Sequence, residues 1–143
     1  MFSVESRKKN TKKIISISRS ILSIFKLNSA ISGLIVLLFH WATVGIPLLG
    51  LFIFQLNWKF YISAFIWFMI CIFHLYFNGC ILTKLERDLW DTKEWYGPWF
   101  VPFALLEHIG ITVTYALAQN IFIIFGILVV IWIIIRIIFN INY

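Results

Sequence analysis

The chain has 143 residues, of which 62% are hydrophobic and only 13% are charged, and its formal net charge is +6. Soluble domains are roughly 45–50% apolar and about 25% charged, and a fold of this length buries only about 70% of its surface. The composition therefore excludes a soluble domain and indicates an integral membrane protein, whose main partner is the lipid bilayer and not nucleic acid. Its two cysteines, Cys71 and Cys80, form no CxxC motif or disulfide framework.

The N-terminal arm is basic. Residues 1–12 have the composition of a disordered tail, and residues 13–28 have the pattern of an amphipathic helix. One face of this helix carries the apolar residues Ile14, Ile17, Ile21, Ile24 and Phe25. We expect the helix to lie on the membrane surface and its basic residues to favour anionic lipid. A targeting presequence has a similar composition and is the alternative.

Four apolar runs follow, and together they predict an all-α, multi-pass domain over residues 29–143. The predicted transmembrane helices cover about residues 31–56, 60–82, 99–118 and 121–139. The last two are separated only by a predicted tight turn at Gln119-Asn120. A single helix across both would be about 60 Å long, far more than a ~30 Å hydrocarbon core.

Basic residues gather on one side of these spans. If the N-terminus is cytoplasmic, Lys59 is the one basic residue outside, and the other eleven Lys and Arg residues are inside. The positive-inside rule therefore predicts cytoplasmic termini in a bacterial inner membrane or an equivalent membrane. Apart from those of the N-terminal arm, most charged residues lie in the predicted cytoplasmic loop, residues 83–98. Leu82, Leu85 and Leu89 keep helical spacing, so the second helix is expected to continue past the membrane surface.

Three histidines and one carboxylate fall in one layer of the predicted bundle, about 12–13 Å from its inner edge at a 1.5 Å rise per residue. They are His40, His74, Glu107 and His108. Ionisable groups inside a membrane are costly and are candidate functional residues. Imidazole and carboxylate suit a transition metal, and two histidines can bind haem axially. The commoner role of such residues is structural, with each side chain bonded to a neighbouring helix.

A short motif lies at the predicted membrane edge. It reads CILTKLE from Cys80 to Glu86, follows a histidine of the first span, His40, and precedes the pair Tyr96-Gly97. This pattern resembles a family of small, uncharacterised bacterial four-helix membrane proteins, in which the motif is Cys-Pro-Leu-Thr-x-x-Glu.

The resemblance covers about residues 34–135, and Ile81 stands where that family has proline. It implies a site at the membrane edge formed by Cys80, Thr83 and Glu86. These three residues are spaced so that they lie along one side of a helix. A charged helix end without any site has the same pattern.

The sequence contains no HExxH, CxxCH or phosphate-binding loop. It therefore favours a non-catalytic membrane subunit, or an assembly or anchoring protein, that contacts a membrane-protein partner or a second copy of itself. The alternative is a redox protein that holds a transition metal or haem in the His/Glu layer. A small channel or transporter is the weaker alternative, because no selectivity filter or ring of charges is evident.

Overall fold

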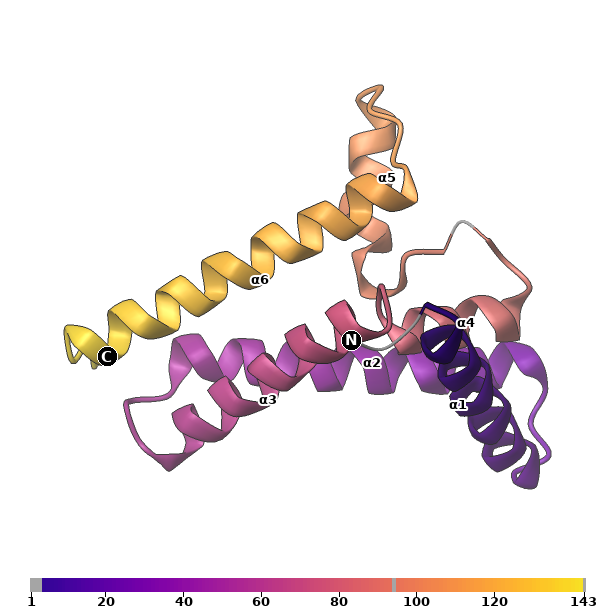
Figure 1. Cartoon of the computed structure of the whole chain (residues 1–143), viewed down its shortest axis with the longest axis horizontal. Coiled ribbons are helices and arrows are strands. Elements are labelled where there is room, and N and C mark those ends of the chain that lie inside the picture. Colours follow the sequence, from indigo (N-terminus) through magenta and orange to yellow (C-terminus); the bar gives the residue numbers. More distant parts are fainter. Residues whose placement is uncertain (1–3, 94, 143) are drawn as a thin grey trace. The chain divides into compact units, whose positions relative to one another are not determined.

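The computed structural model describes residues 4–93 and 95–142, and all regular structure within them is helical (Figure 1). In chain order the elements are α1 (Val4–Ile24), α2 (Ser29–Ile53), α3 (Trp58–Tyr76), α4 (Ile81–Trp90), the 3₁₀ turn η1 (Gly97–Trp99), α5 (Phe100–His108) and α6 (Tyr115–Ile138). The predicted all-α class is confirmed for these residues.

Three helices, α2, α3 and α6, are long and apolar enough to cross a membrane. They contain 25, 19 and 24 residues, which at 1.5 Å per residue matches a hydrocarbon core of about 30 Å. In their most apolar stretches only 28%, 22% and 22% of the residues are buried in the protein. Because so much aliphatic and aromatic surface faces outward, the chain is a helical membrane protein.

The chain divides into two compact units. The first comprises Met1–His40 and Phe73–Phe100, and the second comprises Trp41–Ile72 and Val101–Tyr143. Helices α2 and α3 each contribute residues to both units. Each unit has its own core.

The first unit has a small core that joins α1, α2 and α4. Its buried and partly buried members are Val36, Leu85, Leu89, Ile15, Leu22 and Leu82. Ile15 and Leu22 are seven residues apart, so they lie on one face of α1. An exposed ion pair of 3.1 Å between Arg19 and Asp88 also links α1 to α4, although such pairs stabilise a fold little.

Helix α1 begins nearer the N-terminus than the sequence predicts. Residues 4–12 form its first turns and not the disordered tail, while residues 1–3 lie outside the described residues. The side-chain amide of Asn10 donates a hydrogen bond of 3.1 Å to the Tyr76 hydroxyl. The Thr11 hydroxyl donates one of 2.9 Å to the carbonyl of Arg7. One contact with α3 and one within α1 therefore accompany the helical conformation of a segment whose composition alone favours disorder.

The α3–α4 junction differs from the predicted continuous helix. Asn78 and Gly79 have φ angles of +51° and +110°, and two left-handed residues in succession end a helix. The N–H of Gly79 donates to the carbonyl of His74 at 2.8 Å, which satisfies the end of α3 in the manner of a Schellman cap. Helix α4 then begins anew at Ile81, so Cys80 becomes its N-cap residue and does not lie within a span.

The second unit has an apolar core with a buried cation at one end. The buried residues Leu51, Phe60, Trp67 and Val129 form this core. Arg136 of α6 is also fully buried. Its guanidinium donates to the carbonyls of Leu51 at 2.6 Å, Phe54 at 3.0 Å and Ile141 at 3.0 Å. It also lies 4.8 Å from the ring centroid of Phe60.

The segment before α6 corrects the predicted third span. Helix α5 has only nine residues, about 14 Å at 1.5 Å per residue, which is too short to cross a bilayer. The chain turns at Gly110, where φ is +87°, and α6 starts after Thr114, whose hydroxyl accepts from the N–H of Leu117 at 3.2 Å. The turn predicted at Gln119-Asn120 is wrong, because both residues lie inside α6.

Candidate functional site

A chain of hydrogen bonds joins a thiol, an imidazole and a carboxylate in the first unit. Nε2 of His40, on α2, lies 3.1 Å from Sγ of Cys80. Nδ1 of the same ring lies 2.8 Å from Oε1 of Glu86, on α4. His40 and Glu86 are buried, and Cys80 is half-buried. Both imidazole nitrogens are therefore engaged, one by a nucleophile and one by a carboxylate.

The first turn of α4 sets the environment of the thiol. Burial raises the pKa of Cys80, but the hydrogen bond and charge of His40 and the backbone N–H groups of Thr83 and Leu82 lower it. The net result is a pKa below the ordinary value for a thiol. Thiols at helix N-termini and beside histidine are the reactive ones in proteins.

Glu86 is fully buried, and each of its oxygens has a partner. Oε1 contacts His40, and Oε2 accepts a hydrogen bond of 2.5 Å from the indole N–H of Trp95. A buried carboxylate is tolerated only when it is paired and hydrogen-bonded, and these two partners meet that requirement. The side chain is therefore held in one orientation toward the imidazole.

The covering segment, Trp95 to Gly97, closes over these groups. Gly97 has a φ of +60°, which favours glycine. A Cβ at this position would lie 2.7 Å from Oγ1 of Thr83, 3.0 Å from Cε1 of His40 and 3.2 Å from Oε2 of Glu86. Only a residue without a side chain lets the backbone approach so closely.

Arg87 holds the covering segment in place. Its Nε donates to the carbonyl of Trp95 at 2.5 Å, and its guanidinium lies 5.4 Å from the ring centroid of Tyr96. The rings of Trp90 and Trp95 meet edge to face at 4.8 Å between centroids. These contacts tie the segment to α4, the helix that also carries Glu86.

The structure brings together some of the residues singled out in the sequence. Cys80, Thr83 and Glu86 gather as one cluster. His40 belongs to this cluster and joins the thiol to the carboxylate. His40 was also a member of the predicted His/Glu layer, and Trp95 was not predicted as a partner of Glu86. The resemblance already linked His40 with the CILTKLE motif, so a signal for the cluster was present in the sequence.

The rest of the predicted layer lies elsewhere. His74 is buried in the first unit, whereas Glu107 and His108 are exposed at the end of α5 in the second unit. Within residues 4–93 and 95–142, no group of three or more His, Cys, Asp or Glu side chains has a metal-binding arrangement. A metal or haem held by this layer stays a prediction.

The cluster has the geometry needed for nucleophilic chemistry. An imidazole within hydrogen-bond reach of a thiol can accept its proton, and a carboxylate on the other ring nitrogen orients the imidazole and stabilises its charged form. The N–H groups at the start of α4 are suited to bind a developing oxyanion. No known protein family, curated protein or solved structure matches this chain.

Proposed function

We propose that this membrane protein is a thiol-dependent acyl-transfer enzyme in which Cys80 is the nucleophile. The observation that carries the proposal is the Cys80–His40–Glu86 chain, with contacts of 3.1 Å and 2.8 Å. In this role His40 is the general base and Glu86 fixes the imidazole. Trp95 and Gly97 exclude water from the carboxylate side of the site.

The reaction proceeds in two balanced steps. The proton of Cys80 moves to Nε2 of His40 while sulfur attacks the carbonyl carbon of an acyl ester. The ester C–O bond then breaks, and the leaving alcohol takes the proton from His40, which leaves a thioester on Cys80. In the second step, water or another alcohol gives its proton to His40 and attacks the thioester. Sulfur leaves with that proton, and the thiol is regenerated.

The two cysteines provide the test. Purified protein is incubated with an acyl ester whose chain carries an alkyne, and the label that neutral hydroxylamine releases is measured. Wild-type protein and a Cys71→Ser variant should carry a releasable label, and a Cys80→Ser variant should not. His40→Gln should accumulate the label much more slowly. Absence of a releasable label on wild type, or equal labelling of Cys80→Ser and wild type, would contradict the proposal.

A non-catalytic membrane subunit or anchoring protein is the second candidate. The outward face of α1 supports it, because Ile17, Ile21 and Ile24 are 50%, 53% and 74% exposed there. The opposite face of α1 packs on the core of the first unit through Ile15 and Leu22. We propose that the exposed face lies in the membrane interface, where the basic residues of the arm attract anionic lipid. Vesicles with and without anionic lipid, offered to wild type and to a Lys26→Glu variant at an exposed residue, test this attachment.

The orientation in the membrane is a further part of the proposal. The sequence predicts four spans with both termini in the cytoplasm. Contacts inside the second unit support three spans instead: the N–H of Leu56, in the α2–α3 loop, donates to the side chain of Asn142 at 2.9 Å. Residues in hydrogen-bond contact lie on the same side of a membrane. We therefore propose that the C-terminus shares the outer side with this loop, while ten of the twelve basic residues stay inside.

Single cysteines in a Cys71→Ser, Cys80→Ser background test the orientation. A membrane-impermeant thiol reagent should reach a cysteine at Asn57 and one at Asn142 from the same side, and one at Thr92 from the other. If cysteines at positions 142 and 92 are labelled from the same side, the four-span topology is correct and the three-span proposal is wrong. The assay in inside-out and right-side-out vesicles of a bacterial inner membrane also tests the localisation.

A further inference from the structure

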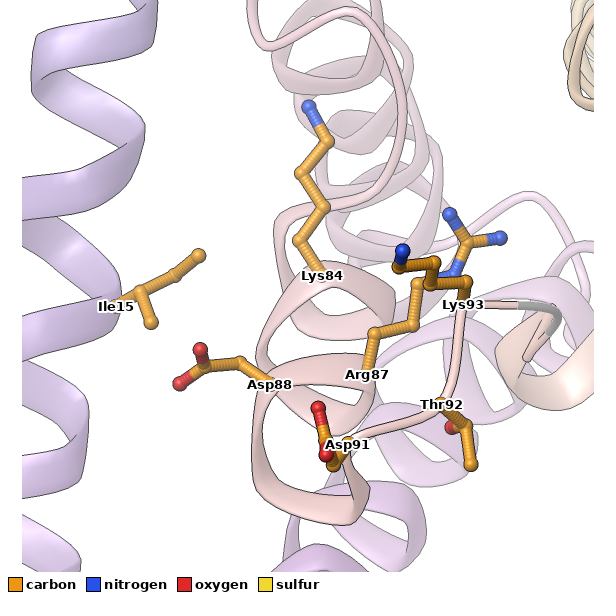
Figure 2. A pocket seen from close by; sticks show the side chains of 7 residues that line it. All are labelled: Ile15, Lys84, Arg87, Asp88, Asp91, Thr92 and Lys93. Carbon is orange, nitrogen blue, oxygen red and sulfur yellow. The ribbon is translucent and has the colours of Figure 1, made fainter.

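A polar pocket of about 380 Å³ lies between α1 and α4 of the first unit (Figure 2). One apolar residue of α1, Ile15, contributes to its wall. The other lining residues come from α4 and the turn after it: Lys84, Arg87, Asp88, Asp91, Thr92 and Lys93. Its volume falls at the low end of the ~300–1,000 Å³ typical of ligand sites. It therefore has room for a headgroup but not for acyl chains.

The pocket has an excess of positive charge. Three of its lining side chains are cationic and two are anionic, and one of the carboxylates, Asp88, already pairs with Arg19 of α1 at 3.1 Å. Figure 2 shows Asp88 directed toward α1. With Asp88 paired, the lining keeps more positive than negative charge, which favours the binding of an anion.

One lining residue of the pocket, Lys84, lies about one helical turn after Cys80. Lys84 follows Cys80 by four residues, about 6 Å along a helix axis at 1.5 Å per residue. Its ammonium donates a hydrogen bond of 2.6 Å to the carbonyl of Phe77, in the turn that leads to Cys80. Burial of Lys84 lowers its pKa, and the charge of Cys80 opposes that change.

We infer that the pocket binds the phosphate group of a glycerophospholipid and that this lipid is the acyl donor for Cys80. The identity of the donor rests on the proposed acyl-transfer function, but binding of the phosphate does not. Guanidinium and ammonium groups are the side chains that bind phosphate in proteins. The phosphate and the sn-2 ester of such a lipid sit on neighbouring glycerol carbons, so a phosphate held by Arg87 and Lys93 can leave the ester nearer the N-terminal end of α4, where Cys80 lies.

Lipid retention by the full chain tests this binding and does not require acyl transfer. A Cys80→Ala variant in detergent is titrated with phosphatidylglycerol, or with an uncharged glucosyl diacylglycerol of the same acyl chains, and the bound lipid is counted by native mass spectrometry. The Cys80→Ala protein should retain phosphatidylglycerol in preference to the glycolipid. Adding Lys93→Gln should weaken retention about five-fold, the factor expected for one basic residue near an anionic headgroup.

Lys59→Gln is the control. Lys59 is an exposed lysine outside the basic arm, and it does not line the pocket. Retention unchanged by Lys59→Gln and weakened by Lys93→Gln supports a pocket that selects phosphate. Equal effects of the two substitutions, or equal retention of the two lipids, would overturn it. Glycerol phosphate that displaces the lipid completely would show that the free phosphate is the true ligand and would overturn the assignment to a lipid.

The result of the lipid-binding experiment can be distinguished from the result of the acyl-transfer experiment. If phosphatidylglycerol binds in the pocket but wild type forms no releasable thioester, the headgroup site stands and acyl transfer fails. If the thioester forms on Cys80 and Lys93→Gln leaves its rate from phosphatidylglycerol unchanged, acyl transfer stands and the headgroup site fails.

Discussion

Trp95 donates its indole N–H to Oε2 of Glu86 at 2.5 Å, while the other oxygen of that carboxylate lies 2.8 Å from His40. The segment that covers the site and the imidazole that contacts the thiol are therefore coupled through one buried side chain. A change in the covering segment reaches Cys80 by way of Glu86 and His40.

The pH dependence of alkylation should identify Cys80 as the reactive thiol. Since the His40 contact and the N–H groups of Thr83 and Leu82 outweigh burial and lower the pKa of Cys80, its thiolate persists to lower pH than that of an ordinary thiol. Iodoacetamide should therefore modify the Cys71→Ser protein at a rate that falls only below the usual thiol pKa of about 8.5. His40→Gln should move the midpoint to higher pH. An identical profile in both proteins would show that His40 does not act on the thiol.

Trp95→Phe should destabilise the first unit. The ring is retained, but the N–H that Glu86 accepts is lost, and hydrogen bonds to charged groups contribute about 1.5–3 kcal/mol. Chemical denaturation in detergent, followed by circular dichroism, measures the change. Trp58→Phe is the control, because Trp58 is 67% exposed and should change stability by less than about 0.5 kcal/mol. Equal losses in the two variants would mean that the Glu86 contact contributes little.

Gly97→Ala should cost more than a typical surface substitution. A left-handed conformation costs a non-glycine residue about 1–2 kcal/mol, and the new Cβ would lie 2.7 Å from Thr83 Oγ1. Gly45→Ala is the matched control, since a Cβ there meets nothing within 4 Å and should stabilise α2 by about 0.5–1 kcal/mol. Adding Thr83→Ala to Gly97→Ala should recover only the part of the loss that comes from crowding. Full recovery would show that the φ angle carries no cost.

Arg136→Leu should loosen the end of the second unit. The carbonyls of Leu51, Phe54 and Ile141 lose their donor, and each buried group left without a partner costs about 1–3 kcal/mol. Arg136→Lys should fall between wild type and Arg136→Leu, because an ammonium cannot reproduce the planar fork. Thermal unfolding and the rate of carboxypeptidase digestion measure the two effects. Lys59→Gln, at an exposed cation of the same unit, should leave both unchanged.

The membrane class and the long helices could be predicted from the sequence because they depend on composition and on uninterrupted apolar runs. The grouping of Cys80, Thr83 and Glu86 could also be predicted from neighbouring residues alone, because their spacing places them on one side of a helix. These properties require no knowledge of which segments of the chain meet in space.

The remaining differences have physical causes. His40 lies 46 residues before Glu86, and its position beside Cys80 depends on the turn at Asn78 and Gly79. That Asn-Gly pair is a strong turn signal, but the apolar residues around it favoured one unbroken helix. The apolar residues also led to the prediction of a turn at Gln119-Asn120, although the glycine at position 110 is the stronger indicator of a turn.

The setting of Arg136 also bears on how the protein is made. Chains insert from the N-terminus at about 5–20 residues per second, so the carbonyls of Leu51 and Phe54 and the ring of Phe60 are in place several seconds before α6 emerges. A lone guanidinium costs about 2.5–3.5 kcal/mol at the membrane centre and less near the end of a span, where Arg136 lies. Here it meets acceptors that earlier segments have already arranged. We therefore expect α6 to insert more readily once the α2–α3 hairpin has formed, because the hairpin supplies the partners of Arg136.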